Sequence, residues 1–276
     1  MKPYNKLTEE DKQSIIKAYY EMIPFKELPE RLDASERAVA RVLKEAGINT
    51  RLKNRYTLNH DYFETIDTEE KAYWLGFIYA DGFVGDEKTN NLVISLIETD
   101  KEHLESFAKC IDYTGDVRIG GRGGFEGSKQ RCTINFSSLK MTSDLRVLGL
   151  YPGKSINMEF MPEIPRELVR HFIRGYFDGD GSVYTSRNTS THKGILYEYQ
   201  APAVSMIGTA SFIKNITEHL TFKHRFKKSK TDGMIYVEYN NKKDMQDIFV
   251  YLYKDATVYL ERKFNKFIDI LGPYYK

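Results

Sequence analysis

Residues 68–81 place apolar and small side chains at intervals of three and four positions, the spacing of one face of an α-helix. That face consists of Ala72, Leu75, Gly76, Tyr79 and Ala80. Gly82 follows Asp81, and helices commonly end at a glycine in the left-handed conformation. We therefore expect a helix that ends at Asp81, with a left-handed Gly82. A carboxylate at this end is unfavourable by ~0.3–1 kcal/mol unless a cation lies nearby, because it faces the negative pole of the helix dipole.

A second copy of the pattern occupies residues 168–181 and ends in Asp180, 99 positions after Asp81, with Gly181 next. Its helical face consists of Leu168, Phe172, Gly175 and Gly179. In each copy two small residues lie four positions apart and leave a stripe of the helix without side chains; they are Gly76 and Ala80, then Gly175 and Gly179. Two such stripes allow helices to pack backbone against backbone. This packing would bring Asp81 and Asp180 side by side.

Each copy begins a run of helical and strand patterns in the same order, αββαββα. After the first motif the patterns cover residues 92–97, 99–113, 116–120, 130–137 and 139–148. After the second they cover residues 182–186, 203–207, 209–220, 224–229, 234–239 and 242–253, and a closing helix covers residues 259–271. The sequence therefore predicts an α+β fold of two pseudo-symmetric halves, residues 57–162 and 163–276, whose motif helices meet at the interface.

Residues 1–56 predict a separate small all-α domain with a linker. Thr8 is a suitable N-cap for a first helix. Two shorter helical patterns follow, at residues 25–32 and 35–46. Their order, with a tight turn and a basic last helix, is similar to that of helix-turn-helix DNA-binding segments. Pro29, which requires a helix that begins late, and Asp33, which replaces the usual turn glycine, depart from that pattern. The alternative is a three-helix packing module with a solvated charged face.

Composition narrows the class of protein. A net charge of +2 over 276 residues does not by itself indicate a nucleic-acid partner, whereas 20 Tyr and 16 Phe suit groove contacts as well as a core. Cys110 and Cys132 lack metal-type spacing and are too few for a secreted scaffold, which indicates a reducing compartment. The sequence has no apolar run near the ~20 residues of a membrane span and no signal-peptide pattern. We expect a soluble protein of the cell interior, in the cytoplasm or nucleoid.

The paired motifs resemble those of the LAGLIDADG homing endonuclease family in its single-chain, two-motif form. The last three motif positions fit at residues 80–82 and 179–181, whereas Tyr79, Arg174 and Tyr176 depart from the consensus. The resemblance extends over about residues 57–271. It implies a saddle of two β-sheets in the major groove of DNA, with staggered cleavage at its centre.

The terminal Asp residues are the candidate metal ligands. Hydrolysis of a phosphodiester needs an activated water and neutralised phosphoryl oxygens, which a divalent metal held by a few carboxylates supplies. Mg²⁺ prefers oxygen ligands and keeps several waters. Asp81 and Asp180, with the helix-end carbonyl groups of Ala80 and Gly179, therefore form a candidate site for Mg²⁺ or Mn²⁺. The family resemblance assigns the same role to these positions, each Asp serving one DNA strand.

The resemblance also implies one basic catalytic residue late in each half. Lys154 matches in the first half and Lys263 in the second, with Lys254 as the alternative to Lys263. For any of these lysines the competing interpretation is a solvated surface charge. Asp178 has no counterpart in the first copy, where Tyr79 stands, and no role is assigned to it.

Basic side chains that follow one strand face favour readout of a DNA groove. Lys223, Arg225 and Lys227 alternate along one predicted strand, although lysines also protect the edge of a solvated sheet. In the first half, basic residues surround a glycine-rich turn, and residues 49–56 form a basic linker. The predicted DNA contacts are Ser35, Arg37, Arg41, Lys44, Arg51, Lys53, Arg118, Arg122, Lys129, Arg131, Lys223, Arg225 and Lys227.

These patterns predict a monomeric, Mg²⁺-dependent, site-specific double-strand DNA endonuclease of a mobile genetic element. The helix-turn-helix would add contacts to one flank of a long, asymmetric target. One alternative is a DNA-binding regulator on the same scaffold without catalysis, which would gain nothing from two carboxylates beside phosphates. The other is an RNA-binding intron maturase, against which a duplex-reading helix-turn-helix argues.

Overall fold

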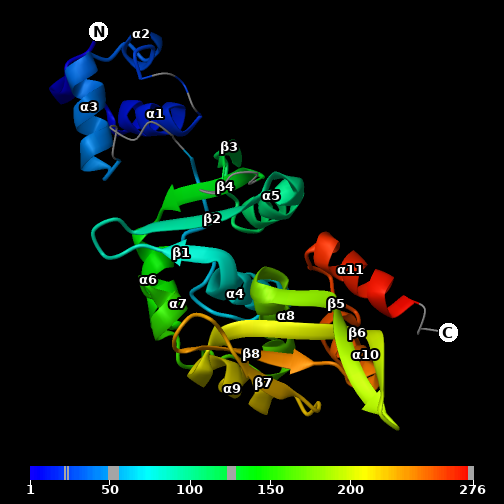
Figure 1. Cartoon of the computed structure of the whole chain (residues 1–276). Helices are drawn as coiled ribbons and strands as arrows, with labels where there is room; N and C mark the ends of the chain where they lie inside the picture. Colours follow the sequence, from blue (N-terminus) through cyan, green and yellow to red (C-terminus); the bar gives the residue numbers. More distant parts are fainter. Residues whose placement is uncertain (22, 24, 49–55, 123–128, 273–276) are drawn as a thin grey trace. The chain divides into compact units, whose positions relative to one another are not determined.

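The computed structural model describes residues 1–21, 23, 25–48, 56–122 and 129–272 (Figure 1). These residues form two units. The first contains Met1–Asn59 and Ile111–Asp116, and the second contains His60–Cys110 and Val117–Lys276. Within the described residues no helix has the length and apolar character that crossing a membrane requires.

The first unit is a cluster of short helices around a small apolar core. Its elements are η1 (Tyr4–Lys6), α1 (Glu9–Tyr20), α2 (Leu28–Arg31) and α3 (Glu36–Glu45). Thr8 and Asp11 form a capping box at the start of α1, as the N-cap prediction requires. Helix α2 is shorter than the predicted helix over residues 25–32, because Pro29 confines the start of the helix to its own first turn. Asp33 adopts the left-handed conformation with φ 47°, as expected of a residue in place of a turn glycine.

The first half of the second unit contains one four-stranded antiparallel sheet, ordered β1-β2-β4-β3. Its helices are α4 (Glu69–Asp81), η2 (Glu98–Asp100), α5 (Lys101–Cys110), α6 (Leu139–Val147) and α7 (Lys154–Asn157). Its strands are β1 (Gly82–Val84), β2 (Asn91–Ile97), β3 (Arg118–Arg122) and β4 (Gln130–Ser137). Strand β1 has no separate sequence prediction, because three residues are too short to display alternation.

The second half repeats this order, with a sheet ordered β5-β6-β8-β7. Its helices are η3 (Arg166–Leu168), α8 (Val169–Asp180), α9 (Ala210–Glu218), α10 (Lys242–Tyr253) and α11 (Glu261–Leu271). Its strands are β5 (Gly181–His192), β6 (Ile195–Thr209), β7 (Arg225–Lys228) and β8 (Met234–Tyr239). The predicted α+β fold with two similar halves is therefore confirmed.

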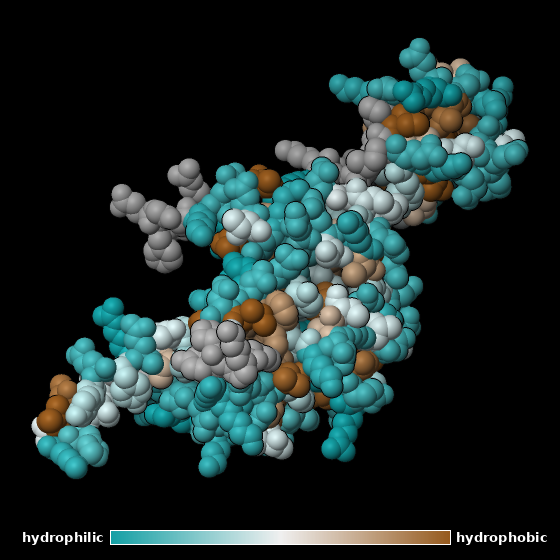
Figure 2. Space-filling model, turned by 90° about the vertical axis from the view of Figure 1, so that its right-hand side faces the viewer, coloured by the Kyte–Doolittle hydropathy of each residue, from teal (hydrophilic) through white to brown (hydrophobic). Residues whose placement is uncertain are grey.

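Strands β5 and β6 are much longer than the predicted strands at residues 182–186 and 203–207. Beyond the sheet they pair only with each other, since β6 pairs with β8 only from Val204 to Thr209. A two-stranded ribbon buries few side chains on either face, so its sequence lacks the alternation of apolar and polar residues that identifies a strand. Elsewhere the exposed face seen in Figure 2 is mostly hydrophilic, with small separate apolar patches.

Helices α4 and α8 lie side by side at the centre of the second unit (Figure 1). A Cβ atom on Gly76 would lie 2.0 Å from the carbonyl oxygen of Phe172, and one on Gly175 would lie 1.9 Å from that of Tyr73. The predicted packing of backbone against backbone is confirmed. Larger residues at these two glycines would force the helices apart.

The prediction of a left-handed Gly82 is wrong. Gly82 and Gly181 are extended, with φ of −81° and −78°, because the chain passes directly from each helix into a strand. Glycine is required there for space, since a Cβ on Gly82 would lie 2.6 Å from the Cγ2 atom of Ile78. This direct exit makes Asp81 and Asp180 the last helical residues.

Candidate active site

Asp81 and Asp180 meet where α4 and α8 end. A Cβ atom on Gly179 would lie 3.3 Å from a carboxylate oxygen of Asp81, so the two helix ends are in contact. Burial raises the pKa of Asp81, and burial together with the charge of Asp81 raises the pKa of Asp180 to about 6. The side chain of Asp81 nevertheless stays open to solvent. The predicted proximity of the two carboxylates is confirmed.

Lys154 supplies a cation at the end of α4. Its side chain is only 8% exposed, and its ammonium group donates hydrogen bonds to the carbonyl oxygens of Tyr79 and, at 2.7 Å, of Ala80. Burial lowers the pKa of Lys154 to about 8, although the carboxylates of Asp180 and Asp81 act in the opposite direction. This lysine is therefore not a solvated surface charge. It belongs to the candidate active centre, by which we mean Asp81, Asp180 and the buried lysines beside them.

Lys263 supplies a cation at the end of α8. It is 6% exposed and donates a hydrogen bond to the carbonyl oxygen of Gly181. Burial lowers its pKa, whereas the charges of Asp178, Asp81 and Asp180 raise it. Lys254, the alternative, is exposed. Lys263 is thus the second lysine that the structure brings to the two carboxylates.

The oxygen atoms around Asp81 and Asp180 fit a metal of the Mg²⁺ type. Among the described residues, neither carboxylate accepts a hydrogen bond or forms an ion pair, and no three His, Cys, Asp or Glu side chains form a metal-binding group. The backbone carbonyl of Gly179 could serve as a further oxygen ligand beside the two carboxylates. The carbonyl of Ala80, the other predicted ligand, already accepts a hydrogen bond from Lys154. The raised pKa values mean that it is unfavourable for both carboxyl groups to be ionised at once. A divalent cation would stabilise this doubly ionised state.

Comparisons with known proteins identify relatives of the fold. Residues 167–249 match the LAGLIDADG-like domain family. This part of the second half therefore resembles a LAGLIDADG-like domain. No curated protein matches the sequence.

The LAGLIDADG fold extends over both halves. I-LtrWI, a LAGLIDADG homing endonuclease bound to target DNA, has 13% sequence identity and a TM-score of 0.52 over 78% of this chain and 90% of its own. I-SmaMI, bound to uncleaved DNA target in the presence of calcium ions, has 14% identity and a TM-score of 0.50 over 75% of this chain and 90% of its own. Structures this distant show a common fold and leave activity to be argued from the site.

The charges of two arginines act on Asp81, but the sequence did not identify these arginines as part of the candidate active site. Arg131 on β4 donates hydrogen bonds to the side chain and backbone of Ser95, at 2.9 and 2.6 Å, and its charge counteracts the raised pKa of Asp81. Arg262 also acts on Asp81 and forms an ion pair with Asp100 at 2.8 Å. The only feature of the sequence that could have indicated a place for Arg262 near Asp81 is its position next to Lys263.

Asp178 is buried and fully hydrogen-bonded. Its carboxylate accepts hydrogen bonds from the hydroxyl groups of Tyr73 at 2.8 Å and Tyr253 at 2.6 Å, and from the backbone N–H of Leu260 at 2.7 Å. Burial raises its pKa against the effect of these donors. These contacts tie α8 to α4, to α10 and to the residue that precedes α11.

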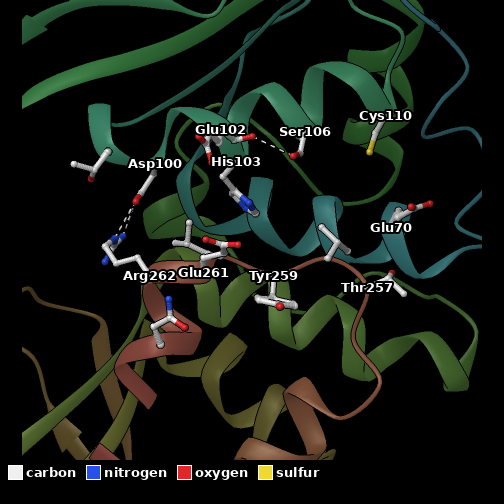
Figure 3. Close-up of a pocket in the computed structure, with 14 residues that line it drawn as sticks. Glu70, Asp100, Glu102, His103, Ser106, Cys110, Thr257, Tyr259, Glu261 and Arg262 are labelled. Atoms are coloured by element: carbon white, nitrogen blue, oxygen red, sulfur yellow. Dashed lines mark hydrogen bonds and ion pairs between the residues drawn. The ribbon is translucent and has the colours of Figure 1, made fainter. Parts of the chain in front are cut away.

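A cavity of about 570 Å³ lies between the η2–α5 region and the segment before α11 (Figure 3). Asp100 and His103 line one side, and Tyr259 and Arg262 line the other. The Asp100–Arg262 ion pair crosses between the two sides. The cavity thus borders the segment that leads to Lys263, while neither terminal Asp lines it.

The predicted DNA contacts of the second unit lie on exposed strands or directly before them. Arg225 and Lys227 share a face of β7, and Lys223 precedes the strand. Lys227 forms an ion pair with the buried Glu238 at 2.7 Å. In the first half the exposed members are Arg118 on β3, Lys129 and Arg131. These positions leave a role in DNA binding open to test.

In the first unit, Ser35 caps α3 by accepting a hydrogen bond from the backbone of Ala38. Arg37 and Lys44 are exposed on α3. Arg41 pairs with Glu45 at 2.8 Å and lies over the ring of Tyr4. Three predicted contacts fall outside the described residues, namely Arg51, Lys53 and the side chain of Arg122.

Proposed function

We propose that the chain is a site-specific double-strand DNA endonuclease that hydrolyses one phosphodiester bond in each strand with the help of a divalent metal. One observation carries the proposal: two carboxylates end two tightly packed helices, and one buried lysine reaches each helix end. A protein that only binds DNA has no use for such a pair. Their raised pKa values are a cost in the folded state that catalysis would justify.

The residues of the centre have complementary roles in this proposal. Asp81 and Asp180 would hold Mg²⁺ or Mn²⁺, with the backbone carbonyl of Gly179 and water completing the ligands. The bound metal would activate water and neutralise phosphoryl oxygens. Lys154 and Lys263 would place ammonium groups against the phosphate, where negative charge increases in the transition state. With a pKa of about 8, Lys154 can also exchange protons near neutral pH.

DNA is the proposed partner of both units. The exposed basic positions on β3, β4 and β7 would contact the backbone and base edges of a long, asymmetric site. The first unit would act as a helix-turn-helix, with Arg37 and Lys44 of α3 towards one flank of the target. I-LtrWI and I-SmaMI, which have the same fold, are bound to DNA in their structures.

A randomised duplex library tests the proposal. The protein would be incubated with the library and Mg²⁺, and the new DNA ends would be sequenced, with the Asp81→Asn, Asp180→Asn double variant as control. Paired ends at one sequence, absent with the double variant, are expected. Selective retention of one duplex without new ends would instead identify a DNA-binding regulator. Selective retention of RNA alone would favour a maturase.

A further inference from the structure

Tyr79 and Asp178 occupy the same motif position, two residues before each terminal Asp, but differ completely in chemistry. Both side chains are buried, at 1% exposure each. Each one bonds to the chain segment that carries the lysine of its own half. The two segments run from the end of α6 to Lys154 and from the end of α10 to Lys263.

In the first half, the hydroxyl group of Tyr79 donates a hydrogen bond to the carbonyl oxygen of Leu148, the residue that ends α6. The chain then turns at Gly149, with φ of 92°. A Cβ atom at Gly149 would lie 2.6 Å from the Tyr79 hydroxyl, so the segment passes directly over this group. Lys154 then reaches back to the carbonyl oxygen of the same Tyr79. Both ends of the segment therefore meet one residue of α4.

In the second half, the carboxylate of Asp178 accepts a hydrogen bond from the backbone N–H of Leu260, the N-cap residue of α11. The backbone N–H of Lys263 donates to the carbonyl oxygen of Leu260 at 2.9 Å, so Leu260 sets the first turn that carries the lysine. Tyr73 and Tyr253 hold the carboxylate in place. A carboxylate that accepts three hydrogen bonds has a fixed orientation, and it fixes Leu260 in turn.

The cavity beside this segment increases the importance of the bond to Asp178. Tyr259, Leu260 and Arg262 line the cavity, so the chain is not packed against protein on that side (Figure 3). Across the cavity, the Asp100–Arg262 ion pair also holds the segment. Farther from Lys263, the backbone N–H of Thr257 donates a hydrogen bond to Glu69, and the carbonyl oxygen of Val258 accepts one from Arg174. This pair fixes Arg262, which follows Leu260 by two residues, whereas the bond to Asp178 fixes the backbone of Leu260 itself.

We propose that Tyr79 and Asp178 are positioning residues, each of which holds the lysine-bearing segment of its own half so that Lys154 or Lys263 reaches its helix end. Neither side chain touches the substrate. The inference that this geometry serves cleavage rests on the proposed endonuclease function. The positioning itself is a property of the free protein and is measured without DNA.

Lysine acylation followed by mass spectrometry measures the positioning directly. The folded protein would be treated briefly with acetic anhydride, and the acetylated fractions of Lys154 and Lys263 compared. Tyr79→Phe is expected to increase the rate at Lys154 by about tenfold, equivalent to about 1.4 kcal/mol, with no change at Lys263. Asp178→Asn is expected to increase the rate at Lys263 by about tenfold, with no change at Lys154.

The control is Tyr176→Phe, because the Tyr176 hydroxyl also donates to a backbone carbonyl, that of Ile207 on β6, but to no lysine-bearing segment. Neither lysine should become more reactive in this variant. If Asp178→Asn does not fold, Tyr253→Phe removes one donor to the same carboxylate and should raise acylation of Lys263 alone. Equal changes at both lysines, or none, would overturn the proposal.

Kinetics then test the link to cleavage. On a cleavable duplex, Tyr79→Phe and Asp178→Asn should lower the single-turnover rate of the saturated complex by about tenfold with unchanged Kd, whereas Tyr176→Phe should change neither quantity. An unchanged rate despite selective acylation would remove the catalytic role and leave the positioning intact. If the parent cleaves no duplex at all, the endonuclease proposal fails, and the acylation result still decides the positioning.

Discussion

Replacement of Asp180 by Asn should stabilise the folded protein in metal-free buffer. The side chain keeps its size and loses a charge that is buried beside Asp81 at the negative end of a helix. Among the described residues the carboxylate has no hydrogen-bond partner to lose. The folded state therefore loses an unfavourable interaction and keeps its packing.

The pKa of Asp180 sets the size of this effect. A rise from 3.8 to about 6 is roughly two units, equivalent to about 3 kcal/mol at about 1.4 kcal/mol per unit. Because the side chain is partly open to solvent, we expect about 1–2 kcal/mol. The folded state binds more protons than the unfolded state between about pH 4 and pH 6, so the parent loses stability as the pH rises through this window. The gain in the variant should be complete above pH 6 and absent below pH 4.

Urea unfolding in EDTA at pH 4.5 and 7.5 measures the gain. The single Trp of the chain, Trp74, is buried in α4 and reports unfolding of the second unit. Asp247→Asn, at an exposed carboxylate of α10, is the matched control and should change little. Addition of Mg²⁺ should stabilise the parent and leave Asp180→Asn unaffected. A variant that is less stable than the parent at pH 7.5, or a gain of equal size at both pH values, would refute the electrostatic reasoning.

Three further predictions concern cleavage and binding. Asp81→Asn should reduce cleavage of both strands by several orders of magnitude in a gel assay. A loss confined to one strand would show that the two sites work independently. Cleavage at the normal rate would contradict the mechanism. A chain that begins at residue 56 should still cleave, with weaker binding and a salt dependence that falls by ~0.9 per lost phosphate contact; unchanged affinity and slope would argue against a DNA-binding first unit. Replacement of Lys223, Arg225 and Lys227 by Ala should raise Kd in a titration while the saturated single-turnover rate stays the same. A large fall in the saturated rate with an unchanged Kd would instead place these residues in the catalytic centre.

The sequence predicted those parts of the fold in which one face of an element is buried. The bounds of β4, β8 and α10 agree with the predicted ranges, because their apolar side chains recur with the period of the element. The outer part of the β5–β6 ribbon escaped prediction, since pairing without a buried face imposes no pattern. The conformation of Gly82 was predicted wrongly, because a helix that continues into a strand uses glycine for space and not for a left-handed turn.

The carboxylates could be predicted from the sequence because both the motif and its spacing repeat. The choice between Lys254 and Lys263 could not, because it depends on the path of the segment before α11. Asp178 was left without a role for a related reason. Its partners Tyr73, Tyr253 and Leu260 come from three separate parts of the chain and have no common sequence pattern.

Stability and the proposed chemistry make opposite demands on neighbouring residues of the same two helices. Close contact at Gly76 and Gly175 packs α4 against α8, which favours the folded state. The same contact brings Asp81 and Asp180 together and buries them, and burial raises the pKa of both carboxyl groups, which disfavours the folded state at neutral pH. Wider helix spacing would lower the pKa values of the carboxylates but would also separate the two groups that would hold the proposed metal. The helix contact therefore holds the two carboxylates together by packing alone, and the proposed metal would offset the unfavourable charge that this packing creates.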